Sequence, residues 1–303
     1  MEWMVVAERL RFPEGPVQLP DGDIAVVEIE AGIISRIDAA GSRTEMAKPG
    51  GGPNGLAMGP DGKLYCCNNG GFTWIEHGGR LIPRVQPDDY SGGRIERIDL
   101  RTGEVELLYR SGDFGCRLNG PNDIVFDREG GFWFSDYGKT RDRDRDRGAI
   151  LYARADGSDL REVVFPVDNP NGIGLSPDGR TLYVAETFTC RLTAYDVVEP
   201  GKIAEKGPLG MSGTPLYRPA GWKFFDSLGV EACGNICVAT IGEPGITVIS
   251  PTGSEVEFVP CADEYTTNIC WGGADLMDAY VTQSATGRLI KGRWPRPGLA
   301  LAY

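Results

Sequence analysis

Six polar residues recur along the chain, each seven positions before a tight turn and each followed by a short apolar run. Two of them are carboxylic acids and four are carboxamides: Glu14, Asn54, Asn122, Asn171, Asp226 and Asn268. A closed repeat architecture would bring equivalent positions together. Six oxygen donors with two negative charges, and without thiolate or imidazole, favour a divalent cation such as Ca²⁺, Mg²⁺ or Mn²⁺. The alternative is that these residues cap strand ends and bind water, since Asn is a common turn residue.

The elements that must position these residues are strands. Short runs rich in β-branched and aromatic residues lie before and after each turn, for example at residues 55–58 and 63–66, or 123–126 and 132–134. Asp-Gly pairs, which favour hairpin turns, separate two such runs at 21–22, 61–62 and 178–179. Further strand candidates follow each hairpin, and no segment has a sustained helical period.

Repeats of four strands, about 50 residues each, are typical of β-propeller blades. The six repeats therefore predict an all-β, six-bladed propeller that forms a single domain over residues 1–303. Radial closure protects the sheet edges that an open array would expose. We expect the closure to come from residues 4–7 and 287–291, which would pair as strands of one shared blade.

The longest step between repeat starts separates Asn54 from Asn122 and indicates an insertion in the second blade at about residues 70–92. This segment carries several aromatic residues. Long loops in compact domains are commonly lids or binding loops, so we expect Trp74 and Tyr90 to contact substrate. The alternative is a packed Ω-loop without a ligand.

Composition excludes several classes of function. The net charge of −12, without a basic run, argues against nucleic acid and anionic membranes as partners and favours solubility or a cationic ligand. The chain has one histidine, His77, so a Ser-His-Asp or Cys-His mechanism would depend on that residue alone.

The eight cysteines lack zinc-site spacing and are expected to be buried free thiols. The first 15 residues have an acid at position 2 and no long apolar core, so they do not resemble a signal peptide. No apolar stretch approaches the roughly 18 residues of a membrane helix. These features predict a cytoplasmic protein and leave its oligomeric state open.

The repeats resemble the senescence marker protein/gluconolactonase family, the regucalcin-like six-bladed propellers, from Phe12 to about Pro297. The order and spacing of the motifs carry this resemblance. The motifs are Phe12-Pro13-Glu14-Gly15-Pro16, Gly52-Pro53-Asn54-Gly55, Gly120-Pro121-Asn122-Asp123, Asn169-Pro170-Asn171-Gly172, Phe225-Asp226-Ser227 and Thr267-Asn268.

The resemblance implies a role for each axial residue. Glu14, Asn171 and Asp226 would ligate the catalytic metal, and Asn122 would be a fourth ligand or would hold the substrate. Asp226 would also be the general base, whereas Asn54 and Asn268 would line the substrate pocket.

Two positions bear on the substrate. Ser227, where Gly is commoner, resembles the bacterial drug-responsive lactonases. Gly120 stands where sugar-lactone enzymes of the family carry Arg, which favours a different or bulkier lactone.

We therefore expect metal-dependent opening of a lactone, with one divalent ion (Ca²⁺ first, with Mg²⁺, Mn²⁺ and Zn²⁺ as alternatives) as Lewis acid. One alternative is hydrolysis of phosphotriesters or other esters on the same frame. Another is a non-catalytic calcium-binding propeller, and a third is a strictosidine-synthase-like propeller, which would depend on an axial Glu rather than a metal.

Overall fold

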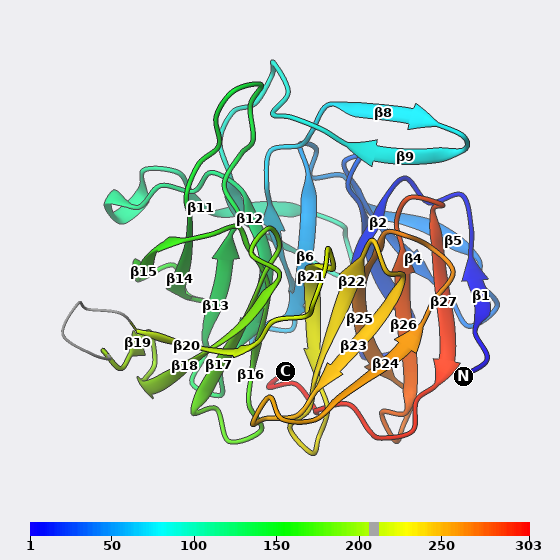
Figure 1. The fold of residues 1–303 in the computed structure, drawn as a ribbon. Helices are drawn as coiled ribbons and strands as arrows, with labels where there is room; N and C mark the ends of the chain where they lie inside the picture. Colours follow the sequence, from blue (N-terminus) through cyan, green and yellow to red (C-terminus); the bar gives the residue numbers. More distant parts are fainter. Residues whose placement is uncertain (206–211) are drawn as a thin grey trace.

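The computed structural model describes residues 1–205 and 212–303. Six antiparallel sheets surround a central axis, which confirms the predicted six-bladed all-β propeller (Figure 1). Within these residues, five of the six blade sheets have four strands and the sheet of the fourth blade has five.

The innermost strand of each blade begins one or two residues before the polar residue of its repeat. These strands are β2 (Pro13–Gln18), β6 (Pro53–Met58), β12 (Pro121–Phe126), β16 (Pro170–Leu175), β21 (Phe224–Val230) and β25 (Thr266–Gly272).

The next strand outwards in each blade is the second arm of the predicted hairpin. These strands are β3 (Ile24–Glu28), β7 (Leu64–Asn68), β13 (Gly131–Asp136), β17 (Thr181–Glu186), β22 (Ile236–Ile241) and β26 (Asp278–Gln283).

The third strands are β4 (Ile33–Ile37), β10 (Arg94–Ile98), β14 (Gly148–Arg154), β18 (Arg191–Glu199), β23 (Gly245–Ile249) and β27 (Arg288–Arg293). The outer strands are β5 (Arg43–Ala47), β11 (Val105–Arg110), β15 (Leu160–Val167), β19 (Lys202–Ile203), β20 (Gly213–Tyr217), β24 (Val256–Pro260) and β1 (Met4–Ala7). A short 3₁₀ helix, η1, spans Asp113–Gly115.

The chain closes as the sequence predicted. β1 pairs antiparallel with β27, with Met4 opposite Lys291 and Val5 opposite Ile290, so the N-terminal strand completes the sixth blade. The indole of Trp3, just before β1, donates to the Pro260 carbonyl of the fifth blade at 3.0 Å. The two ends of the chain therefore hold one blade together.

The innermost strands form a closed ring in the order β2, β6, β12, β16, β21, β25 and back to β2. Each of them leaves regular pairing at its polar residue, for example between Glu14 and Val17 in β2 and between Phe225 and Leu228 in β21. Bulges of this kind bend a strand and re-aim side chains. The same irregularity, repeated around the ring, aims the polar residues at the axis.

The residue after the axial one sets how closely neighbouring blades approach. A Cβ on Gly55 would lie 2.5 Å from the Asn122 carbonyl oxygen, and a Cβ on Gly172 would lie 2.5 Å from the Leu228 amide nitrogen. Only glycine allows this backbone-to-backbone approach. The glycine of the Pro-Asn-Gly motif therefore packs the ring while its Asn faces the axis.

The apolar core lies between neighbouring blades. Trp133 and Tyr152 of the third blade, for example, share a buried cluster with Leu182 and Val184 of the fourth. Each blade thus buries its two faces against its neighbours, which explains the continuous apolar runs in the inner strands.

The insertion in the second blade contains a hairpin, β8 (Trp74–His77) with β9 (Arg80–Pro83), instead of a strandless loop. It covers the end of the propeller where the innermost strands begin (Figure 1). The Leu81 amide donates to the Ala285 carbonyl of the sixth blade at 3.0 Å. The Gln86 amide donates to the Thr140 carbonyl beside the third blade at 2.8 Å. The hairpin is therefore anchored on both sides.

All eight cysteines are free, and five of them are buried as expected: Cys66, Cys67, Cys116, Cys190 and Cys237. The prediction is wrong for Cys233, which is exposed because it lies in the tight turn of the fifth blade. Cys261 and Cys270 are half-buried.

In residues 1–205 and 212–303, no helix has the length and apolarity to cross a membrane.

Candidate metal and active site

The six predicted axial residues come together at one end of the channel, and all of them are buried. Their exposed fractions run from 3% for Glu14 to 8% for Asn122 and Asp226. The strands that carry them are neighbours around the ring. Buried polar side chains require partners, so the contacts of each one define the chemistry of the site.

The Glu14 carboxylate is held by two hydrogen bonds. Its Oε2 accepts a hydrogen bond from Asn268 Nδ2 at 2.8 Å and another from the Gly15 amide at 2.6 Å. Asn268 Oδ1 in turn accepts from the Ile269 amide at 2.7 Å, which fixes its amide group. Burial nevertheless raises the pKa of Glu14 to about 7. Asn268 therefore orients the Glu14 carboxylate.

Asp226 and Asn171 form the opposite side of the site. Burial, followed by the negative charge of Glu14, raises the pKa of Asp226 well above its usual value, and a hydrogen bond with Asn171 works against this. Asn171 Nδ2 donates to Thr187 Oγ1 at 3.2 Å. The Ser227 hydroxyl donates to Asn171 Oδ1 at 3.4 Å. The two acids of the ring are close enough to repel each other.

Asp123 is a third buried acid that sequence analysis quoted in a motif but did not assign to the site. Its carboxylate accepts hydrogen bonds from the Ile124 amide at 3.0 Å and the Ile173 amide at 3.3 Å. Burial, followed by the charge of Glu14, raises the pKa of Asp123 to about 8. The sequence carried a signal for this residue, because Asp123 stands at the position that glycine occupies after three other axial residues, at Gly15, Gly55 and Gly172.

The donors of the ring fit a divalent cation. Asn122 Oδ1 is buried and has no hydrogen-bond partner among residues 1–205 and 212–303. An unsatisfied buried acceptor costs about 1–3 kcal/mol. A cation would satisfy this oxygen and offset the repulsion between the buried carboxylates. No three His, Cys, Asp or Glu side chains of the described chain group as a metal site. The oxygen donors that fit a divalent cation are therefore a combination of carboxylates and carboxamides.

The predicted substrate-contacting residues all lie at this end of the channel. Asn54 is buried in β6 beside Gly15. Trp74 packs its ring 5.1 Å from that of Phe12, two residues before Glu14. The Tyr90 hydroxyl donates to the Asn119 carbonyl at 2.6 Å. Both aromatic residues are thus packed against the segments that precede axial residues, and their contact with substrate stays a prediction.

A row of aromatic residues that sequence analysis missed leads from Asp226 to the surface. The Asp226 charge reaches Tyr137, whose pKa is raised by burial first and by this charge second. The Tyr137 ring lies 6.5 Å from Phe188, which lies 5.8 Å from Phe224. Trp222, 80% exposed, lies 5.8 Å from Phe224. We call Tyr137, Phe188, Phe224 and Trp222 the aromatic row.

Calcium binding should stabilise the protein through Glu14. A ligand at 100 times its Kd stabilises a protein by about 2.7 kcal/mol, and we expect a rise in melting temperature when Ca²⁺ is added to chelated protein. Glu14→Gln should remove most of this rise, whereas Glu45→Gln, at an exposed site, should keep it. Thermal unfolding with and without Ca²⁺ measures both. An equal calcium response in Glu14→Gln would exclude Glu14 as a ligand.

Comparison with known proteins identifies the family of the chain. The family model described as "SMP-30/Gluconolactonase/LRE-like region" matches residues 12–285. Diisopropyl-fluorophosphatase of Loligo vulgaris is 30% identical, covering 97% of this chain and 92% of that protein. Lactonase drp35 of Staphylococcus saprophyticus is 26% identical, covering 84% of this chain and 71% of that protein.

The fold recurs in solved structures. A gluconolactonase structure from Xanthomonas campestris superposes with a TM-score of 0.74 and 20% identity, covering 97% of this chain and 89% of that chain. At this identity the likeness supports the fold alone. The family model covers most of the chain and includes the axial residues from Glu14 to Asn268. The chain therefore belongs to the SMP-30/gluconolactonase/LRE-like family.

Proposed function

We propose that this protein is a divalent-cation-dependent hydrolase that opens lactones at the axial site. The observation that carries the proposal is the buried ring of oxygen donors, in which Asn122 Oδ1 has no partner in the described chain and Glu14, Asp123 and Asp226 repel one another. Glu14, Asn122, Asn171 and Asp226 would hold the cation. Membership of a family with lactonase relatives supports the reaction class.

The bound cation would supply Lewis-acid polarisation of the ester carbonyl. Asp226 would position the attacking water and accept its proton as the water oxygen adds to the carbonyl carbon. The ring C–O bond then breaks, and the leaving oxygen takes up that proton to give a hydroxy acid. Asn268, through its hydrogen bond to Glu14, and Thr187, through its bond to Asn171, would keep these side chains in place.

The aromatic row indicates the kind of lactone. Exposed aromatic rings beside a polar site favour a substrate with an apolar or aryl group. Arg145 stacks 4.9 Å from the Phe188 ring and borders the same surface. Gly120, without a side chain, provides no charged group for sugar hydroxyls. We therefore infer an apolar or aryl lactone rather than a sugar lactone.

A lactone panel tests the function. We expect turnover of a benzo-fused six-membered lactone to exceed that of glucono-1,5-lactone, because the aromatic row can stack on an aryl ring. Chelation should abolish turnover of both, and added Ca²⁺, Mg²⁺, Mn²⁺ or Zn²⁺ should restore it to different extents. Turnover that survives complete metal removal, confirmed by elemental analysis, would overturn the proposal.

The aromatic row should control binding of the apolar lactone. Phe188→Ala and Trp222→Ala should each raise its KM about 10-fold, the effect of losing 1–2 kcal/mol of apolar contact, and leave kcat nearly unchanged. Phe165→Ala is the matched control, because Phe165 is similarly exposed (57%) but lies on β15. Steady-state kinetics measure these effects. Equal KM values in all three variants would show that the aromatic row does not bind the substrate.

Hydrolysis of organophosphates is a second candidate function. The observation that favours it is the 30% identity to diisopropyl-fluorophosphatase over 97% of the chain. The same oxygen ring could serve attack at phosphorus. Side-by-side assays of a lactone and a phosphorofluoridate ester distinguish the two candidates, since the preferred substrate class should have a kcat/KM at least about 100-fold higher.

A further inference from the structure

The far end of the channel, beneath the axial residues, contains a cavity of about 760 Å³. Gly15, Asp123 and Asn268 form its roof, and the later residues of the innermost strands form its walls. The C-terminal segment, Leu299–Tyr303, crosses its floor, at the end of the propeller opposite the β8–β9 hairpin (Figure 1). We propose that this cavity, the rear cavity, is a second binding site, for an uncharged apolar small molecule.

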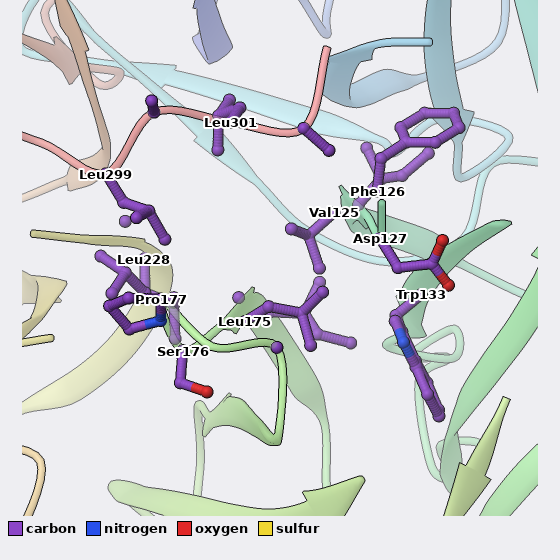
Figure 2. Close-up of a pocket in the computed structure, with 18 of the residues that line it drawn as sticks. Val125, Phe126, Asp127, Trp133, Leu175, Ser176, Pro177, Leu228, Leu299 and Leu301 are labelled. Carbon is purple, nitrogen blue, oxygen red and sulfur yellow. The ribbon is translucent and has the colours of Figure 1, made fainter. Parts of the chain in front are cut away.

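The walls of the rear cavity are largely apolar. Val125, Leu175, Leu228 and Leu299 surround its open centre, and Trp133 lies at its edge (Figure 2). Small-molecule sites are typically concave, mostly apolar and 300–1,000 Å³ in volume. Cavities lined by apolar side chains also take up apolar guests in preference to water. The rear cavity meets these conditions.

The rear cavity meets the axial site at Gly15, Asp123 and Asn268, where neighbouring innermost strands pack closely against one another. Gly172 lies against the main chain of Ser227 and Leu228, and Gly55 lies against that of Asn122 and Asp123. The Asp123 carboxylate bonds the Ile124 and Ile173 amides within the same layer. The side chains that would hold the cation, Glu14, Asn122, Asn171 and Asp226, do not line the rear cavity, so a molecule there lies beneath the proposed hydrolytic site.

The charged side chains at the rim of the rear cavity disfavour the binding of acidic ligands. Between the third and fourth blades the rear cavity reaches four acidic side chains and two basic ones: Asp127, Glu129, Asp178 and Glu199, with Arg128 and Arg180. The protein as a whole carries a net charge of −12. An aliphatic carboxylate would be repelled, whereas the alcohol of the same chain length would not. The proposed ligand is therefore neutral.

The C-terminal segment is held at its start and carries apolar side chains over the rear cavity. The Leu299 amide donates to the Val230 carbonyl at 2.8 Å, and the Tyr303 ring lies 5.7 Å from Phe126. Between these anchors Leu301 lines the cavity and is still 58% exposed. A ligand beneath it would cover this exposed apolar surface.

Binding of the uncharged dye N-phenyl-1-naphthylamine tests the proposal, followed by its fluorescence with the full chain. We expect saturable binding at one site. Decanol should displace the dye at a concentration at least 10-fold lower than decanoate. Leu175→Trp, which fills the centre of the rear cavity, should weaken dye binding at least 10-fold. Leu301→Asp, at an exposed position that does not threaten folding, should do the same.

Two control variants separate the rear cavity from other surfaces. Trp222→Ala should leave dye affinity unchanged, because the aromatic row lies at the other end of the channel. Leu107→Asp, at a similarly exposed position on β11, should also leave it unchanged. Unsaturable binding, displacement by decanoate as effective as by decanol, or unchanged affinity in Leu301→Asp would overturn the proposal. None of these readouts depends on hydrolysis, so the outcome is independent of the proposed function.

Discussion

Asp226→Asn is expected to lower kcat/KM for lactone hydrolysis by about 10³-fold while the propeller stays folded. The substitution keeps the shape of the side chain but removes the proposed cation ligand and the proposed acceptor of the proton of the attacking water. General-base catalysis contributes about 10²–10⁴-fold to rate. Asp226 also lies within the charge field of Glu14 and Asp123. Loss of its charge therefore affects the electrostatics of the whole site.

This electrostatic effect gives Asp226→Asn a signature that a misfolded variant would not have. In chelated protein the variant should melt at a higher temperature than the wild type, because one of three mutually repelling buried carboxylates is gone. Its response to added Ca²⁺ should be much smaller. Asp142→Asn, at an exposed position, should change neither activity nor calcium response. Near-normal kcat/KM in Asp226→Asn would exclude both roles of this carboxylate.

Sequence repetition was enough to predict the propeller and the ring of axial residues. A repeat with a constant offset places equivalent residues at equivalent points, so the burial of Glu14 and Asn268 on one axis follows from spacing alone. The pairing of β1 with β27 could be predicted because one strand candidate remains at each end of the repeats and an unpaired sheet edge is unfavourable. These are properties of the backbone pattern.

The contacts that orient the axial residues could not be predicted from spacing. Glu14 and Asn268, whose side chains share a hydrogen bond, are 254 residues apart. Thr187, which bonds Asn171, belongs to no repeated motif. Tyr137 and Phe188 meet across the third and fourth blades through loops whose conformation the repeat does not specify. Which side chains contact the axial residues therefore depends on how the different blades pack against one another.

The rear cavity was also beyond sequence analysis. Val125, Leu175 and Leu228 have the apolar character of ordinary core positions in strands. Their spacing does not show whether the side chains that face one another fill the channel. The C-terminal segment has no strand pattern, so its position over the channel floor is a result of packing. The apolar pattern indicates strands and does not show that a cavity lies between them.

Gly172→Ala is expected to destabilise the protein by about 3 kcal/mol, because the added Cβ meets main-chain atoms that cannot rotate away. It would lie 2.5 Å from the Leu228 amide nitrogen, 2.7 Å from the Ser227 carbonyl carbon and 2.8 Å from the Asp226 carbonyl oxygen. Overpacking of this kind typically costs 1–3 kcal/mol, and backbone contacts belong at the upper end. Urea unfolding with added Ca²⁺ measures the loss.

The matched control is Gly62→Ala, at a turn with φ of 72° and open space around the Cβ. Gly62→Ala should lower the free energy of unfolding by only about 1 kcal/mol, because alanine is disfavoured in a left-handed backbone conformation. The position also lies far from the axial ring. Gly172→Ala should also weaken calcium binding at least 10-fold, since the displaced backbone carries Asp226, whereas Gly62→Ala should not. Equal losses of stability and calcium affinity in the two variants would contradict the close approach of β16 and β21. The expected difference arises because the contact that closes the ring also positions the Asp226 carboxylate.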